Sequence, residues 1–357
     1  MSVPLVIVTV VMAVVLIIRP YGLLGREEVA GEHGQVGAPE TPIRPYGPMG
    51  QALIAALLLG LALLPLFVDQ FMLILTIDMV IFALFAASLH FILGSGGLVS
   101  FGHAAFFGGG AYAAALLVFH TDTPMELAFL FAPLAAGLLA LGIGWFCIRL
   151  TGVYFAMLTL AFSQLVWSLA FQWRAVTRGD DGLVNIWPSE WLSGTETYYY
   201  FALILGVGGI LFLRHVIHSP FGYALRAGRD SPRQAEATGI DVKRVQFVAF
   251  ALAGAMAGLA GGIFVFAKGS VFPTELEIAK SFDALIVVFL GGVKTLAGGV
   301  VGAGFMTVVE DWLTRLEYWR LLLGLVIIAV VIVMPEGIVG TLRTLWRRIR
   351  NTDEETV

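Results

Sequence analysis

Eleven apolar runs, several of them separated by only a few polar residues, dominate this chain. A bilayer core needs about 20 apolar residues per straight helix, and only helices or closed barrels satisfy every backbone polar group there. Hydrophobic residues make up 59% of the sequence and charged residues 13%, which excludes a soluble domain of ordinary composition. The sequence therefore predicts an all-α polytopic membrane protein with about 10–11 transmembrane helices, several of them short or broken by glycine.

The apolar runs divide the chain into three parts. The predicted spans are residues 3–18, 52–68, 71–93, 100–119, 127–148, 153–172, 199–213, 245–267, 282–293, 296–310 and 319–335. Residues 1–51 are expected to form an extra N-terminal helix and a Gly- and Pro-rich cytoplasmic linker, because the first run lacks the basic n-region of a cleaved signal peptide. Residues 52–340 then form the transmembrane domain, and residues 341–357 form a cytoplasmic tail.

The distribution of Lys and Arg predicts which side of the membrane each loop faces. The polar segment 214–244 lies between two apolar runs and holds six basic residues against three acidic ones. Cytoplasmic loops carry an excess of Lys and Arg, so we place this segment in the cytoplasm. The other loops then alternate, and the outer ones hold only six of the 21 Lys and Arg residues: Arg174, Arg178, Lys268, Lys280, Arg315 and Arg320. This arrangement predicts an external N-terminus and a cytoplasmic C-terminus.

The basic segment also carries the signals of two short helices. Ser219-Pro220 combines a preferred N-cap residue with proline at the first helical position. Asp230-Ser231-Pro232 provides a second start, and Gly239 is placed to end that helix. Two short helices joined by a turn on the cytoplasmic face would form a docking surface. The alternative is an ordinary solvated basic loop.

Glycines are concentrated around the start of the span predicted at 100–119. Glycine permits close backbone approach or a helix break, and interrupted spans mark the translocation route in many transporters. We therefore predict a broken or re-entrant segment over 95–110 that lines a path together with the polar side of the 153–172 span. The candidate path residues are Ser95, Gly96, Gly97, Ser100, Gly102, His103, Gly109, Thr159 and Gln164. Close helix packing is the alternative for any single glycine.

Other polar motifs predict no catalytic or metal site. Asp78 lies inside the 71–93 span, where a carboxylate must be protonated, paired or in contact with water. Asp180-Asp181 in the predicted outer loop lacks the companion His or acid that a metal site needs. Lys294-Thr295 follows Val293 instead of the Gly that a P-loop requires. The single Cys147 excludes an intrachain disulfide, and no nucleic-acid motif stands out.

With these residues in hand, the chain resembles the permease subunits of branched-chain amino-acid ABC importers, in the hydrophobic amino-acid uptake family. The resemblance runs from about Leu73 to Gly340. Its strongest segments are 96–108 (GGLVSFGHAAFFG), 221–227 (FGYALRA), 235–241 (AEATGID) and 290–292 (LGG). It implies the architecture of an ABC-importer permease, with a coupling loop that docks on an ATPase. The residues carried over to that loop are Gly222, Leu225, Arg226, Ala235, Glu236, Ala237 and Gly239.

The resemblance further implies that this chain is not itself an enzyme and binds no cofactor, metal or nucleic acid. ATP and Mg²⁺ would bind to two cytoplasmic ATPase subunits. The other partners would be a second, usually different, permease subunit and a periplasmic substrate-binding protein, at the bacterial inner membrane. The family's outer loop usually begins Thr-Gly-Gly, whereas this chain has Thr177-Arg178-Gly179, which leaves the cargo preference open.

Three functions are compatible with the sequence in different degrees. ATP-driven import of branched-chain or related hydrophobic amino acids is favoured, and urea, short-chain amides or aromatic acids are the alternative cargo within the family. A secondary transporter or channel would need intramembrane charges as coupling sites, for which Asp78 is the main candidate. A membrane enzyme would need a catalytic constellation, and the sequence offers none.

Overall fold

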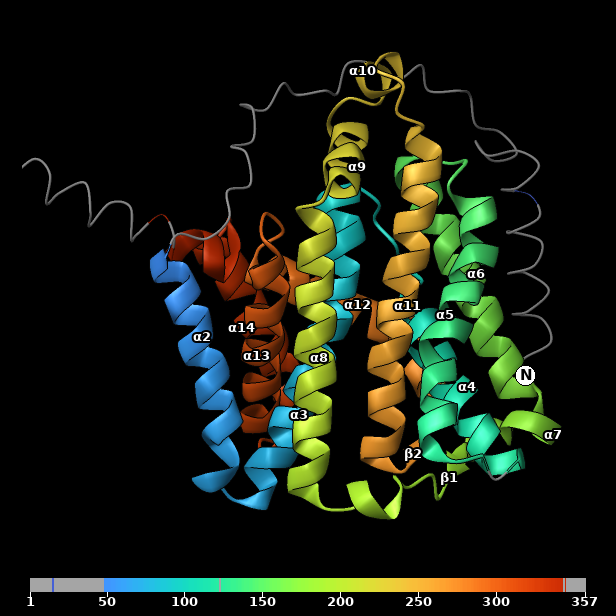
Figure 1. Ribbon diagram of the computed structural model, residues 1–357, viewed down its shortest axis with the longest axis vertical. Helices are drawn as coiled ribbons and strands as arrows, with labels where there is room; N and C mark the ends of the chain where they lie inside the picture. Colours follow the sequence, from blue (N-terminus) through green and yellow to red (C-terminus); the bar gives the residue numbers. More distant parts are fainter. Residues whose placement is uncertain (1–14, 16–47, 122, 343, 345–357) are drawn as a thin grey trace, which may run out of the picture.

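The computed structural model describes residue 15, residues 48–121, residues 123–342 and residue 344 of the chain. Within these residues the structure is a bundle of α-helices with one small sheet at its edge (Figure 1). The predicted helix at 3–18 lies outside the described residues, apart from residue 15, and so does the linker as far as residue 47. The first helix of the bundle begins at Pro48, slightly earlier than predicted.

The long helices match the predicted spans. They are α2 (Pro48–Leu63), α3 (Gln70–His90), α4 (Ala104–Thr121), α5 (Met125–Cys147), α6 (Gly152–Gln172), α8 (Thr195–Ile217), α11 (Val242–Lys268), α12 (Ile278–Gly291), α13 (Leu296–Leu313) and α14 (Trp319–Val333). Each span predicted between residues 52 and 335 corresponds to one of them. Eight helical segments among the described residues are long and apolar enough to cross a membrane, which confirms the all-α polytopic prediction.

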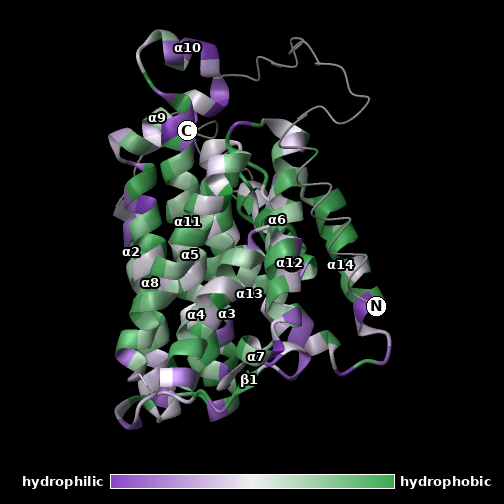
Figure 2. Cartoon of the chain, turned by 90° about the vertical axis from the view of Figure 1, so that its right-hand side faces the viewer, coloured by the Kyte–Doolittle hydropathy of each residue, from purple (hydrophilic) through white to green (hydrophobic). Residues whose placement is uncertain are grey.

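Shorter elements lie at the two ends of the bundle. After α6 come α7 (Arg174–Thr177), two 3₁₀ turns (Gly179–Asp181 and Glu190–Leu192) and strand β1 (Leu183–Val184). β1 pairs antiparallel with β2 (Ser270–Val271), and we call this the β end. α9 (Pro220–Asp230) and α10 (Pro232–Ala237) lie at the opposite end, which we call the α10 end (Figure 1). Hydrophilic residues concentrate at both ends and hydrophobic residues along the helices between them, as a bilayer requires (Figure 2).

Small residues bring α4, α5 and α11 into close contact. A Cβ built on Gly110 of α4 would lie 2.5 Å from the Cα of Gly258 in α11. A Cβ on Gly258 would in turn lie 2.2 Å from the Cβ of Ala136 in α5. A larger residue at either glycine would force the helices apart, so these contacts are the small-residue packing typical of membrane bundles. Close helix packing, the alternative given for single glycines of this region, therefore accounts for Gly110.

The chain is broken between α3 and α4. α3 continues as a π-helical turn (Phe91–Ser95) and ends at Gly96, and residues 97–103 are then non-helical and mostly buried. α4 begins at Ala104, whose backbone N–H donates to the Ser281 hydroxyl of α12 at 2.8 Å. Non-helical backbone at membrane depth is tolerated where protein or water surrounds it, and here protein surrounds most of it.

A second break precedes α12. The segment 269–277 contains β2 and then forms a 3₁₀ turn (Pro273–Leu276). This turn packs against α4, since a Cβ on Gly108 would lie 2.5 Å from the Leu276 side chain. α12 follows with only 14 residues, which is too short for a straight span. α12 begins at Ile278, four residues before the predicted span, so Lys280 lies in its first turn and not in the segment before it. Pro273 and Glu275 belong to the packed 3₁₀ turn, whereas Lys280 belongs to the helix that follows it.

Candidate functional site: the α9–α10 hairpin and segment 96–103

The α9–α10 hairpin forms from the local signals that the sequence carries. The Ser219 hydroxyl accepts a long hydrogen bond from the N–H of Gly222 (3.5 Å), and Pro220 occupies the first position of α9. α10 begins at Pro232 and ends at Ala237. Gly239 has φ of +89°, and the N–H of Ile240 donates to the carbonyl of Ala235 at 3.1 Å, which closes a Schellman motif. The predicted pair of short helices is confirmed.

The two helices of the hairpin have different surroundings. Leu225 of α9 is fully buried, whereas Glu236, Ala237 and Gly239 are exposed. Ala235 is the buried residue of α10. No ion pair to Glu236 forms among the described residues. The tip of the hairpin is free in this chain to contact another protein.

α9 is fixed in place by contacts at both of its ends. Arg226 donates to the carbonyl of Ile217 (3.0 Å), which ties α9 to the end of α8. A Cβ on Gly222 would lie 2.3 Å from the same carbonyl oxygen, so only glycine allows this approach. A Cβ on Gly228 would lie 2.8 Å from the Val242 side chain at the start of α11. α9 is therefore wedged between α8 and α11.

The inner side of α9 contacts the start of the broken segment. The guanidinium of Arg229 donates to the carbonyl oxygen of Gly94. Gly97 has φ of +67°, and a Cβ there would lie 2.7 Å from Arg229 Cγ. The Leu225 side chain lies 3.4 Å from the position of a Cβ on Gly96. A displacement of α9 would therefore be transmitted directly to Gly94–Gly97.

The far end of segment 96–103 contacts α6 and α12. The N–H of Phe101 donates to the Thr159 hydroxyl of α6 at 3.2 Å. A Cβ on Gly102 would lie 2.2 Å from the Thr159 carbonyl oxygen and 3.2 Å from Ser163 Cβ. Together with the bond from Ala104 to Ser281, these contacts hold the segment between two helices. It links α9 at one end to the middle of the bundle at the other.

Several hydroxyl groups around this segment are buried without a partner. Ser100 and Ser163 are fully buried, and neither hydroxyl has a hydrogen-bond partner among the described residues. His103 is also buried, and its Nε2 lies 2.8 Å from the Ser88 hydroxyl while its ring stacks on Phe85. Buried polar groups are almost always paired with protein or water. Among the described residues, these two hydroxyls therefore lack the partner that a buried polar group normally has.

Not every predicted path residue lies at this segment. Ser95, Gly96, Gly97, Ser100, Gly102, His103 and Thr159 are brought together, as described above. Gly109 instead faces α5, where the Leu139 side chain would be 3.1 Å from its Cβ. Gln164 is a half-buried residue of α6 next to Ser163. Sequence reasoning grouped Gly109 with the break because it is close in sequence, but it lies inside the regular part of α4.

The charge inside the 71–93 span is paired. Asp78 Oδ2 of α3 lies 2.8 Å from Lys268 Nζ at the end of α11, and both side chains are about one-third exposed. Asp78 is therefore paired, which is one of the three conditions predicted for a carboxylate inside this span. Asp180 and Asp181 form a turn after Gly179, and the described residues contain no group of three His, Cys, Asp or Glu that would hold a metal.

The Gly-rich stretch at 291–299 forms a packed turn at the α10 end. A Cβ on Gly291 would lie 1.7 Å from the Gly298 carbonyl oxygen, so the start of α13 packs directly on the end of α12. Lys294 Nζ lies 3.3 Å from Glu336 Oε1, after α14. His90 Nε2 of α3 lies 2.7 Å from the Val293 carbonyl oxygen, which connects this turn to the break after α3.

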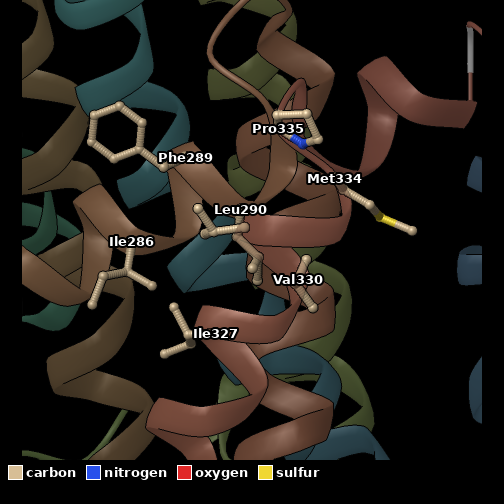
Figure 3. Close-up of a pocket in the computed structure, with 8 residues that line it drawn as sticks. Ile286, Phe289, Leu290, Ile327, Val330, Met334 and Pro335 are labelled. Atoms are coloured by element: carbon tan, nitrogen blue, oxygen red, sulfur yellow. The ribbon is translucent and has the colours of Figure 1, made fainter.

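Two features of the site were missed by sequence reasoning. Arg229 was counted only as a basic loop residue, and Ser281 was assigned to no site. Both act through contacts with residues far away in sequence, so no local pattern identifies them. An apolar groove of about 310 Å³ between α12 and α14 was also not foreseen. Its lining residues are Ile286, Phe289, Leu290, Ile327, Val330, Val331, Met334 and Pro335 (Figure 3).

A helical membrane bundle with internal breaks and an exposed helical hairpin at one end defines a polytopic membrane transport subunit. Residues 71–331 match the family model of the branched-chain amino acid transport system permease component. The chain belongs to this family. The match covers the bundle from α3 almost to the end of α14.

Individual relatives are more distant. The high-affinity branched-chain amino acid transport system permease protein LivM of Escherichia coli (strain K12) is 26% identical over 292 residues, which cover 74% of this chain and 68% of LivM. The probable branched-chain amino acid transport permease protein LivH of Methanocaldococcus jannaschii is 29% identical over 166 residues (43% and 49%). The autoinducer 2 import system permease protein LsrC of Escherichia coli (strain K12 / DH10B) is 29% identical over 174 residues (42% and 51%). No solved structure matches the chain.

Proposed function

We propose that this chain is a membrane-spanning subunit of an ATP-driven importer that carries branched-chain or related hydrophobic amino acids across the bacterial inner membrane. Family membership and the names of the LivM and LivH relatives support this cargo. The observation that carries the proposal is the contact of α9 with Gly94–Gly97. It joins an exposed hairpin, suited to dock on a separate motor subunit, to a broken segment inside the bundle.

In this proposal the hairpin is the coupling element. The exposed residues of α10 and its end, Glu236, Ala237 and Gly239, enter a groove of a cytoplasmic ATPase subunit that binds ATP and Mg²⁺. Closure of two ATPase subunits displaces α9, and Arg229 and Leu225 transmit the displacement to segment 96–103. That segment then changes which side of the membrane the path faces, which is alternating access.

The proposal fixes an orientation and a set of partners. The α10 end and the C-terminal tail face the cytoplasm, and the β end faces the periplasm, where a substrate-binding protein delivers the cargo. A second permease subunit completes the path. The chain divides into an N-terminal extension (1–51), the transmembrane domain (52–340) and a tail (341–357).

The alternatives to this proposal are a secondary transporter and an ATP-driven importer of a different cargo. For a secondary transporter the sequence offered Asp78 as the main coupling charge, and Asp78 is paired with Lys268. The name of the LsrC relative indicates that a similar permease serves a different cargo, so urea, amides or aromatic acids stay as alternative cargo. A panel of ligands tested on the partner binding protein would decide between them.

The test is transport by the reconstituted complex combined with cross-linking. Proteoliposomes with ATP inside should accumulate leucine, isoleucine and valine only when the binding protein is present. A cysteine at Glu236 should cross-link to the ATPase subunit, and a cysteine at Ser193, exposed at the β end, should not. The native Cys147 is buried and gives no background. Uptake that needs no ATP, or a cross-link from Ser193 instead of Glu236, would contradict the proposal.

A further inference from the structure

Lys280 pairs with Glu275 where α12 begins, and two further carboxylates lie near this pair, outside the site described above. Lys280 Nζ lies 2.9 Å from Glu275 Oε2, and both Asp283 of α12 and Glu310 of α13 interact electrostatically with Lys280. We call these four residues the Lys280 cluster. It combines three carboxylates with one ammonium group. Ionisable groups within a membrane bundle are costly, so they mark functional sites by default.

The cluster already holds one primary ammonium group. The Lys280 ammonium lies over three aromatic rings, at 6.0 Å from the centre of Phe82 and 5.5 Å from those of Phe107 and Phe264. These rings come from α3, α4 and α11. An ion pair combined with aromatic faces is the usual environment that stabilises an ammonium ion in a protein. The surroundings of Lys280 are therefore built for this kind of cation.

Two of the carboxylates have no ion-pair partner among the residues that the structure describes. Asp283 is half-buried and Glu310 is exposed on the surface of the bundle. Neither makes a salt bridge or a side-chain hydrogen bond with the residues that the structure describes. Lipid cannot solvate a carboxylate, so this side of the bundle must meet water, a ligand or another protein.

A third polar group at the cluster is also unpaired. Tyr112 of α4 is 5% exposed and its hydroxyl interacts electrostatically with Glu275. This hydroxyl has no hydrogen-bond partner in the described part of the chain. A buried hydroxyl without a partner is rare, and it can accept from an ammonium or donate to a carboxylate. It is evidence, independent of the acids, for a missing polar ligand.

An apolar surface continues from the cluster along α12. Asp283, Ile286 and Leu290 are three and seven residues apart, so they lie on one face of the helix. Ile286 and Leu290 line the groove of about 310 Å³ between α12 and α14, which Ile327 closes from the other side (Figure 3). Asp283 and Ile286 are separated by nearly one helical turn, which rises about 5 Å. A branched aliphatic amino acid has about this length from its nitrogen to its methyl groups.

We propose that Asp283, supported by Glu310, binds the primary ammonium group of the transported solute while the groove at Ile286 and Leu290 takes its aliphatic side chain. This rests on the proposed function and deepens it. It selects a solute that combines an ammonium group with a branched apolar chain. Urea, short-chain amides and aromatic-acid anions lack that ammonium group and would be disfavoured.

The test uses the complete permease–ATPase complex in nanodiscs without the binding protein, and saturation-transfer NMR to detect weak ligands. Three probes share one branched chain: leucine, isoamylamine, which lacks the carboxylate, and isocaproate, which lacks the ammonium group. Leucine and isoamylamine should give signals that survive excess NaCl, and isocaproate should not. Asp283→Asn should weaken leucine binding about tenfold, as expected for loss of one charge-assisted hydrogen bond.

The matched control is Asp311→Asn. Asp311 neighbours Glu310 but is already paired with Arg315 at 3.7 Å, so leucine binding should not change. Size-exclusion chromatography should show that Asp283→Asn forms the same permease–ATPase complex as the wild type, so that weaker binding is not a failure of assembly. The proposal is overturned by equal binding of isocaproate, by displacement of leucine with NaCl, by wild-type binding in Asp283→Asn, or by no binding to the wild type. The proposed function fails separately, when the wild-type complex shows no ATP-dependent uptake.

Discussion

Arg229 of α9 donates a hydrogen bond to the carbonyl oxygen of Gly94, which lies 135 residues earlier in the chain. The bond joins the hairpin at the α10 end to the π-helical turn that ends α3. The Arg229 side chain also packs against Gly97, where the backbone is left-handed. A hairpin that merely formed a solvated loop would not need this connection. Because of this contact, we infer that α9 transmits a movement of the hairpin to the break after α3.

Removing this link should separate ATP hydrolysis from transport. We expect Arg229→Ala to lower leucine uptake about tenfold or more while most of the ATP hydrolysis remains, because a charge-assisted hydrogen bond is lost at the joint and not at the docking surface. Both rates are measured on the same proteoliposomes. Lys243→Ala, exposed at the same end, is the control and should behave as wild type. Equal loss of both activities would instead mean that Arg229 serves docking.

Gly102 should be required for assembly and not only for transport. A Cβ there would lie 2.2 Å from the Thr159 carbonyl oxygen, whereas a Cβ on Gly109 would meet only the end of the Leu139 side chain at 3.1 Å. Overpacking of this kind costs about 1–3 kcal/mol. Thermal unfolding of the purified complex should show a clearly lower Tm for Gly102→Ala than for Gly109→Ala. Equal Tm values would show that segment 96–103 is able to move away without cost.

The pair of Asp78 and Lys268 should be structural. Neutralising one partner leaves the other charge unpaired, so Asp78→Asn and Lys268→Gln should each lower the Tm more than the double variant does. Because both side chains are about one-third exposed, we expect a coupling energy of only about 1 kcal/mol. ATP-driven uptake should persist in the double variant. If uptake disappears in the double variant while the Tm recovers, the pair has a transport role, as in a secondary transporter.

The two ends of the bundle should face opposite sides of the membrane. Single cysteines at Ser189, at the β end, and Ser231, between α9 and α10, are both half-buried and therefore matched in exposure. An impermeant thiol reagent added to intact cells should label Ser189→Cys and not Ser231→Cys. Labelling of Ser231→Cys from outside would reverse the orientation derived from the Lys and Arg distribution.

Local patterns in the sequence were sufficient for the helices and for the hairpin. Apolar runs located α3 to α14, because each helix must cover its own backbone in lipid. Ser219-Pro220 and Gly239 located the starts and the end of α9 and α10, because caps act within one turn. The break near Gly96 was also foreseen, since glycine accumulates where a helix stops.

Contacts between distant segments could not be foreseen in the same way. Nothing near Arg229 indicates Gly94 as its partner, and nothing near Ala104 indicates Ser281. Lys280 was assigned to the segment before the predicted span, yet it lies in the first turn of α12, where it pairs with Glu275 and lies over three aromatic rings. Gly109 was grouped with the break by proximity, but helix geometry turns it toward α5.

The central claim is that the tip of the hairpin couples ATP hydrolysis to transport, and Gly239 tests it most directly. Gly239 has φ of +89° and open space around it, so a leucine there changes the exposed tip and strains the turn by roughly 1 kcal/mol. Gly152 is a matched control, with φ of +58° and equally open surroundings. Substrate-stimulated ATP hydrolysis is measured in the reconstituted complex. The account predicts that Gly239→Leu loses this stimulation and Gly152→Leu keeps it; wild-type stimulation in Gly239→Leu would contradict it.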